Sequence, residues 1–183
     1  MLVLDAGDVR LRRLDGRDAA DLFGMFSDPE VMRYWSRPPM TDVAQANALL
    51  KQVLDDYGTG ASLPLGIERR RDGVLVGNCT LHHFHETSRR AEIGYCLGRR
   101  YWGHGYMHEA LQTLVAYAFG DLDLNRLEAD IDPRNLRSAR SLERLGFVKE
   151  GHLRSRWIVA GEVSDTGFYG LLRDDWQRAR GGD

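Results

Sequence analysis

The sequence has only two cysteines, no long apolar run and no block of basic residues. No apolar stretch approaches the roughly 20 residues that span a bilayer. The formal net charge is −2, without a basic tail, which argues against a general nucleic-acid binder. Cys79 and Cys96 lack the spacing of metal ligands and lie in strand-like runs, where we expect them buried and unbonded. We therefore expect no membrane partner, no nucleic-acid partner and no metal.

The beginning of the chain lacks the features of a secretory signal. Residues 1–14 include Asp5 and Asp8 and have no basic region ahead of an apolar one. We therefore expect a cytoplasmic location. The chain has 183 residues, of which 43% are hydrophobic, and its composition does not shift along its length. This predicts that residues 1–183 form a single domain with a sizeable core.

The spacing of apolar residues predicts an α+β fold. Residues 9–14 alternate as a strand, after which Asp15 is expected to cap a first helix and Thr41 a second. Consecutive strand-like runs with short turns come next, which predicts antiparallel pairing. They span residues 62–69, 74–84 and 91–98. A helix, a strand, a short helix closed by Gly146 and two final strands complete the order βααβββαβαββ. This order suits a sheet with helices on both faces.

Gly103 and Gly105, in WGHGYM, separate the third of these strand-like runs from the following helix. The first N–H groups of a helix lack intrahelical partners and lie at the positive end of its dipole, so this junction suits a phosphate. A tight turn that needs only positive φ is the alternative. No Lys-Ser/Thr pair follows the glycines, and His108 stands where a dinucleotide fingerprint has its third glycine. Both familiar nucleotide-binding classes are therefore disfavoured.

Two linked motifs, AEIGYCLGRRYWGHGYMHEAL and NLRSARSLERLGF, resemble the GNAT superfamily of acetyl-CoA-dependent N-acetyltransferases, in its RimJ/RimL-like branch. The similarity covers nearly the whole chain. It implies the GNAT fold, a mixed, mostly antiparallel twisted sheet. It also implies direct acetyl transfer from acetyl-CoA, as co-substrate, to a primary amine, either a protein N-terminus or a small molecule. A non-catalytic acetyl-CoA sensor is the alternative, and a homodimer is possible.

The resemblance also implies where coenzyme A binds. In the family its pyrophosphate rests on backbone amides of a loop written R/Q-x-x-G-x-G/A, which Arg100 to Gly105 fit literally. The branch usually aligns Trp102 in the Arg/Gln place, and Met107 stands where a small residue is common. Free backbone groups of residues 93–97 would pair with pantetheine. The cofactor-binding residues expected are Ile93, Tyr95, Cys96, Leu97, Arg100, Trp102, Gly103, His104, Gly105, Tyr106, Met107, Asn135 and Ser138.

Glu92, at the start of EIGY, matches a position that is a candidate general base in this branch. An exposed charge at a strand end is the alternative. His82, His83 and His85 on the preceding strand are competing bases. Strand alternation predicts that His83 and His85 share one face and that His82 lies on the other.

The tyrosine that many GNAT enzymes use as the acid is replaced by Leu142 in LERLGF. Asn135 and Ser138 preserve an N-x-x-S arrangement, which implies that Ser138 is catalytic and donates a hydrogen bond to the coenzyme sulfur. The alternative is that both residues only cap the helix. Tyr34 and Trp35, together with Glu92, lie where the family builds its acceptor pocket, although Trp35 also suits the core. Asp165 matches an acidic position that is more often structural.

Overall fold

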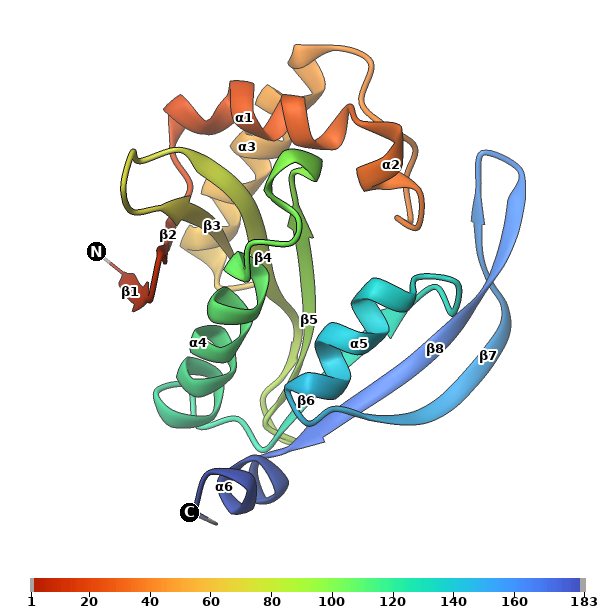
Figure 1. The fold of residues 1–183 in the computed structure, drawn as a ribbon. Helices are drawn as coiled ribbons and strands as arrows, with labels where there is room; N and C mark the ends of the chain where they lie inside the picture. Colours follow the sequence, from red (N-terminus) through yellow and green to blue (C-terminus); the bar gives the residue numbers. More distant parts are fainter. Residues whose placement is uncertain (1, 182–183) are drawn as a thin grey trace.

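The computed structural model describes residues 2–181, and within them one twisted sheet of eight strands runs through the molecule (Figure 1). The strand order is β1-β2-β3-β4-β5-β6-β8-β7, and neighbours are antiparallel except β5 and β6. The strands are β1 (Val3–Ala6), β2 (Val9–Arg13), β3 (Leu63–Arg69), β4 (Leu75–His85), β5 (Arg90–Leu97), β6 (Arg126–Ile131), β7 (Val148–Val159) and β8 (Glu162–Leu172). The predicted α+β class and the mixed, mostly antiparallel sheet are confirmed.

Helices cover both faces of this sheet (Figure 1). They are α1 (Ala19–Phe26), α2 (Pro29–Met32), α3 (Val43–Thr59), α4 (Tyr106–Gly120), α5 (Leu136–Arg144) and α6 (Arg173–Gly181). Side chains of α4 and α5 pack in one core cluster, and those of α1–α3 pack in a second. In the part of the chain that is described, no helix combines the length and apolarity needed to cross a membrane.

The order of elements predicted from the sequence lacks β1, α2 and α6. β1 pairs with β2 across a tight turn in which Gly7 has a φ of 62°. A strand of four residues is too short to show alternation. The arginine-rich α6 has no buried residue, although the ring centroid of its Trp176 lies 5.4 Å from that of Phe119. Elements held by so few apolar contacts leave little hydrophobic pattern in the sequence.

The predicted caps of the first two helices both need correction. Asp15 does cap, but it caps a 3₁₀ turn (Gly16–Asp18) that leads into α1. Thr41 does not cap α3, because the neighbouring Asp42 accepts a 2.7 Å hydrogen bond from the Ala44 N–H. Gln45 completes this capping box by accepting a 3.3 Å hydrogen bond from the Asp42 N–H. A carboxylate is the stronger acceptor at the positive end of a helix.

β5 carries side chains into both core clusters because its residues alternate between the faces. Ile93 packs on the α4 side, and Cys96 packs on the side of α1–α3. Cys79 and Cys96 are buried and free, as expected. Burial raises the pKa of each thiol to about 12.

β5 and β6 are paired over only three residues, which end at Glu92 opposite Glu128. Beyond Glu92 the two strands separate, as Figure 1 shows. The far part of β5 therefore has a backbone edge that this pairing leaves free. This agrees with the free backbone groups expected over residues 93–97.

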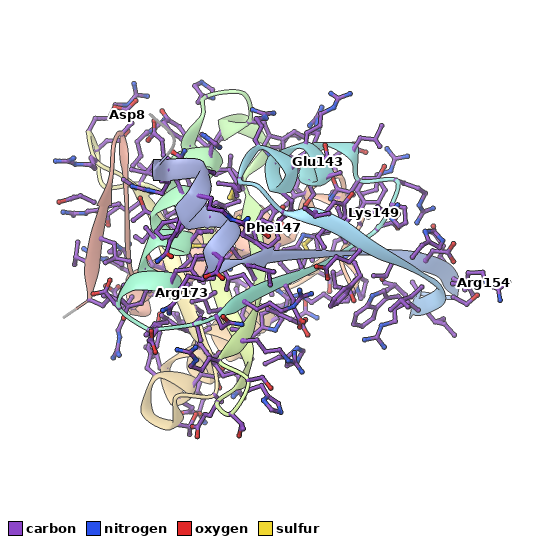
Figure 2. The ribbon with its side chains drawn as sticks, turned by 90° about the horizontal axis from the view of Figure 1, so that it is seen from below. Asp8, Glu143, Phe147, Lys149, Arg154 and Arg173 are labelled. Carbon is purple, nitrogen blue, oxygen red and sulfur yellow. The ribbon has the colours of Figure 1, made fainter. Side chains whose placement is uncertain are left out.

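The β7–β8 hairpin projects from the body of the molecule (Figure 1), and β7 is the edge strand. Figure 2 shows Lys149 near the body and Arg154 farther out along the hairpin. The pairing shifts register between Leu153 and Trp157, and Ser155 there has a φ of 50°. The strand therefore bends rather than running straight.

A buried ion cluster joins β2, β3 and the turn before α1. Arg12 binds Glu68 and also donates a 2.7 Å hydrogen bond to the Oδ1 of Asp18. Glu68 is 2% exposed and Arg12 is 6% exposed. Burial alone raises the pKa of Glu68, but hydrogen bonds from Arg12 and Arg10 outweigh it and hold that pKa below its ordinary value. The charged form of Glu68 therefore stabilises the fold.

We predict that Glu68→Gln lowers the free energy of unfolding by about 1.5–3 kcal/mol at neutral pH, the usual value of a hydrogen bond to a charged group. A carboxylate with a lowered pKa stabilises above its ordinary pKa of 4.5, and this contribution disappears as the pH falls through the lowered value. The difference between wild type and variant in urea titrations should therefore shrink on acidification. Glu86→Gln, at an exposed position, is the matched control. A stability difference between wild type and Glu68→Gln that does not change with pH would contradict the lowered pKa of Glu68.

Candidate functional site

A cleft of about 490 Å³ lies where β5 leaves β6, and α5 contributes to its wall. It adjoins a larger cleft of about 660 Å³. The two clefts share a set of lining residues, so they form one continuous groove across the end of the sheet. The shared residues are Arg33, Tyr34, Trp35, Tyr95, Arg134, Asn135 and Ser138.

The glycine loop forms the start of α4 beside the smaller cleft. Gly103 and Gly105 have φ values of 79° and 84°, and Gly105 is the N-cap, without a side-chain cap. A Cβ atom added to either glycine would meet nothing within 4 Å. The glycines therefore provide positive φ and leave the first N–H groups of α4 open to an anion.

The expected cofactor residues divide into two groups. Most line the clefts, but Arg100, His104, Gly105 and Tyr106 do not. The guanidinium of Arg100 lies over the Tyr101 ring, 4.8 Å from its centroid, and the Tyr106 side chain is buried. The residues that line the clefts are Ile93, Tyr95, Cys96, Leu97, Trp102, Gly103, Met107, Asn135 and Ser138.

Trp102 is held in the cleft wall by a 2.8 Å hydrogen bond from its Nε1 to the carbonyl oxygen of Leu97. The guanidinium of Arg137 lies 4.4 Å from the centroid of its indole ring. Arg100, by contrast, is exposed and away from the cleft. These positions favour the alignment of the loop in which Trp102 takes the place of the family's Arg or Gln.

Tyr95 and Ser138 meet where the two clefts join, with their hydroxyl oxygens 2.6 Å apart. The Ser138 N–H also donates a 3.2 Å hydrogen bond to the Oδ1 of Asn135, so Asn135 is the cap of α5. Burial raises the pKa of Tyr95 to about 12, although the bond with Ser138 opposes that rise. The sequence predicted a role for Ser138 but not its contact with the Tyr95 hydroxyl, because this contact joins residues 43 positions apart.

Glu92 lies opposite His82 in the β4–β5 pairing and lines the larger cleft. A bulge follows His82, and His83 has a φ of 51°. The ring centroids of His82 and His83 are therefore only 4.6 Å apart, and the Nδ1 of His83 lies 3.1 Å from the Oε1 of Glu92. The alternation predicted for these histidines is wrong, because it assumed a regular strand. His85 makes a separate contact, as its Nδ1 accepts a 3.2 Å hydrogen bond from the Ser88 N–H.

Tyr34 and Trp35 lie in the lining shared by both clefts. Trp35 also packs edge-on against Phe26, with ring centroids 5.5 Å apart, so it serves the core as well as the cleft. Asp165 lies outside the lining of both clefts. It binds the Nε2 of His152 and the N–H of Ser155, each at 2.8 Å, which is a structural role.

Comparisons with known proteins agree with this geometry. The family profile described as "Acetyltransferase (GNAT) domain" matches residues 8–148. An uncharacterized N-acetyltransferase p20 of Bacillus licheniformis is 37% identical over 166 residues, which are 91% of this chain and 93% of the relative. A [ribosomal protein uS5]-alanine N-acetyltransferase of Escherichia coli is 34% identical over 178 residues, 93% of this chain and 90% of the relative.

A solved structure with the same fold is the spermidine N-acetyltransferase of Vibrio cholerae in complex with CoA and spermine. Its TM-score is 0.82, with 20% identity over 93% of this chain and 98% of that one. The chain belongs to the GNAT family of acetyltransferases. It is an N-acetyltransferase, and its relatives confirm the RimJ-like resemblance.

We predict that Tyr95 stays protonated at pH values where an ordinary tyrosine, with a pKa of 10.0, is already ionising. The difference in tyrosinate absorbance between wild type and Tyr95→Phe should appear only as the pH approaches about 12. Because the Ser138 bond lowers this pKa, Ser138→Ala should move the Tyr95 titration further upward. A difference signal centred near 10 would contradict the burial of this hydroxyl.

Proposed function

We propose that the protein transfers the acetyl group of acetyl-CoA directly to a primary amine, within a ternary complex. The observation that carries this proposal is the continuity of the two clefts, which share Tyr95, Asn135 and Ser138. One cleft adjoins the glycine loop and the other contains Glu92. A thioester and an amine bound in this groove would react without a covalent enzyme intermediate, because alignment of two reactants can lower the barrier by about 7–11 kcal/mol.

Acetyl-CoA fits the features of the smaller cleft. The open N–H groups at the start of α4 suit its diphosphate, and the free edge of β5 over residues 93–97 suits the amides of pantetheine. The bound thioester supplies an activated acyl group. The chain then has to align the amine, accept a proton and stabilise developing charge.

Glu92 is the general base in this proposal, and Ser138 donates to the sulfur. The amine nitrogen attacks the thioester carbon, the C–S bond breaks, and the amine proton passes to the Glu92 carboxylate. The Ser138 hydroxyl donates a hydrogen bond to the leaving thiolate and in turn accepts one from Tyr95, 2.6 Å away. This pair replaces the tyrosine for which the chain has Leu142, a fully buried residue.

The charges of the larger cleft favour an acceptor with one reactive amine, such as a protein N-terminus. Asp132 and Glu162 both line this cleft, and Arg134 binds each of them at 2.6 Å. One arginine therefore engages both carboxylates, and the larger cleft is lined by as many arginines as carboxylates, so it offers no net negative charge to a polyamine. The aromatic side chains of Tyr34 and Trp35 would pack against the first residues of a peptide or the body of a small amine.

We predict that calorimetric titration with acetyl-CoA shows one site per chain, and that Gly105→Ala weakens it by about tenfold or more, which corresponds to about 1.4 kcal/mol. The added Cβ would be strained at a φ of 84° and would enter the open space beside the loop. Gly60→Ala is the matched control, because Gly60 also has positive φ, 71°, and open surroundings but ends α3. It should reduce stability and leave the affinity unchanged. Absence of binding, or equal loss in both variants, would overturn the proposed cofactor site.

We predict that free thiol is released from acetyl-CoA only when an amine is present, and that Glu92→Gln slows this release about 100-fold or more, the usual contribution of a general base. N-terminal peptides, polyamines and aminoglycosides are the amines to screen. Acetyl-CoA affinity should not change in this variant, and Glu86→Gln should behave as wild type. Unchanged turnover at every pH would remove Glu92 from the role. Tight binding without release for every amine class would favour the acetyl-CoA sensor instead.

A further inference from the structure

The bulge at the end of β4 brings three potential metal ligands together. His82, His83 and Glu92 each place one ligand atom so that all three atoms lie within 4.8 Å of one another. They come from two adjacent strands, since His82 is paired with Glu92 across the sheet. The cluster is therefore part of the fold rather than a chance meeting of long surface side chains.

The spacing within this cluster suits a small divalent ion. Bonds of about 2.0–2.1 Å in tetrahedral geometry place neighbouring ligand atoms about 3.3 Å apart. The Nδ1 of His83 and the Oε1 of Glu92 are already 3.1 Å apart. A ligand atom of the half-buried His82 lies within 4.8 Å of both of these atoms.

The backbone of His83 maintains this convergence. In a regular strand His83 would point away from His82. Its left-handed backbone, with a φ of 51°, turns it to the same side, at a cost of about 1–2 kcal/mol for a residue other than glycine. The fold therefore accepts a locally unfavourable conformation at the position where the two imidazoles and the carboxylate meet.

The surroundings of the cluster leave its charge available to a cation. Across residues 2–181 the ion-pair partner of Glu92 is His83, and no arginine or lysine lies within 4.0 Å of its carboxylate. All three side chains line the larger cleft, so a bound ion would keep an open position for water or another ligand.

We propose that His82, His83 and Glu92 form a three-ligand site for a divalent transition metal of the zinc class, and that an ion bound there inhibits acetyl transfer. Two imidazole nitrogens and one carboxylate oxygen are a donor set that suits zinc, cobalt and nickel, whereas calcium and magnesium prefer oxygen. The inhibition rests on the proposed function, because an ion would occupy the Glu92 lone pair that takes the amine proton. The metal site itself does not depend on that function.

Zn²⁺ is titrated calorimetrically into the chelator-treated protein without acetyl-CoA, and Co²⁺ is followed by its visible absorption, which reports coordination geometry. We expect one ion per chain in wild type and an affinity at least tenfold lower in His83→Asn. Asparagine tolerates positive φ, so this variant keeps the backbone. His85→Asn is the matched control at a nearby exposed histidine and should bind as wild type. No stoichiometric binding, or equal affinity in wild type and His83→Asn, would show an adventitious ion only and overturn the site.

Inhibition is measured by chromatography of the acetylated product, because zinc also binds the released thiol. Equimolar Zn²⁺ should slow wild type, and a chelator should restore the rate. His83→Asn should keep its own metal-free rate when Zn²⁺ is added. Full turnover of zinc-loaded wild type would overturn the inhibitory role of the ion, whereas the proposed metal site would still stand. Zinc binding in a protein that acetylates none of the amines would contradict the proposed function alone.

Discussion

The separation of β5 from β6 is the constraint on which the groove depends. Three parallel residue pairs hold the strands together, and the pairing stops at Glu92. A backbone that lacks a partner strand must find its hydrogen bonds elsewhere, so the free part of β5 is prepared for a ligand with amide groups. The same separation lets α5 approach, which brings Ser138 to Tyr95. Loss of this gap would remove both clefts together.

The bulge in β4 is a second irregularity on the opposite side of β5. A regular β4 would send His82 and His83 to opposite faces and leave Glu92 beside only one of them. The observed bulge instead concentrates three titratable groups at the wall of the larger cleft. Bulges commonly redirect side chains beside functional sites, and this one changes what Glu92 can bind.

The sequence predicted the elements with strong periodicity and the glycine loop, because each depends on local spacing. It also predicted Asn135 as a possible cap, which α5 confirms. It failed where the outcome depended on distant neighbours or on an irregular backbone. The Tyr95–Ser138 contact joins two elements that only the sheet brings together, and the His82–His83 pair depends on a positive φ that no glycine marks. The cap of α3 was expected at Thr41, but the observed cap is the next residue, Asp42. Both are good cap residues, and spacing alone cannot separate adjacent candidates.

Burial of the two cysteines has a practical consequence for chemistry around this groove. Burial raises the pKa of both thiols to about 12, so Cys79 and Cys96 stay protonated near pH 8. The folded chain is therefore nearly inert to disulfide reagents, alkylating agents and mild oxidants. Cys96 lines the smaller cleft, and its protonated thiol would exchange only slowly with the disulfide form of a coenzyme bound there.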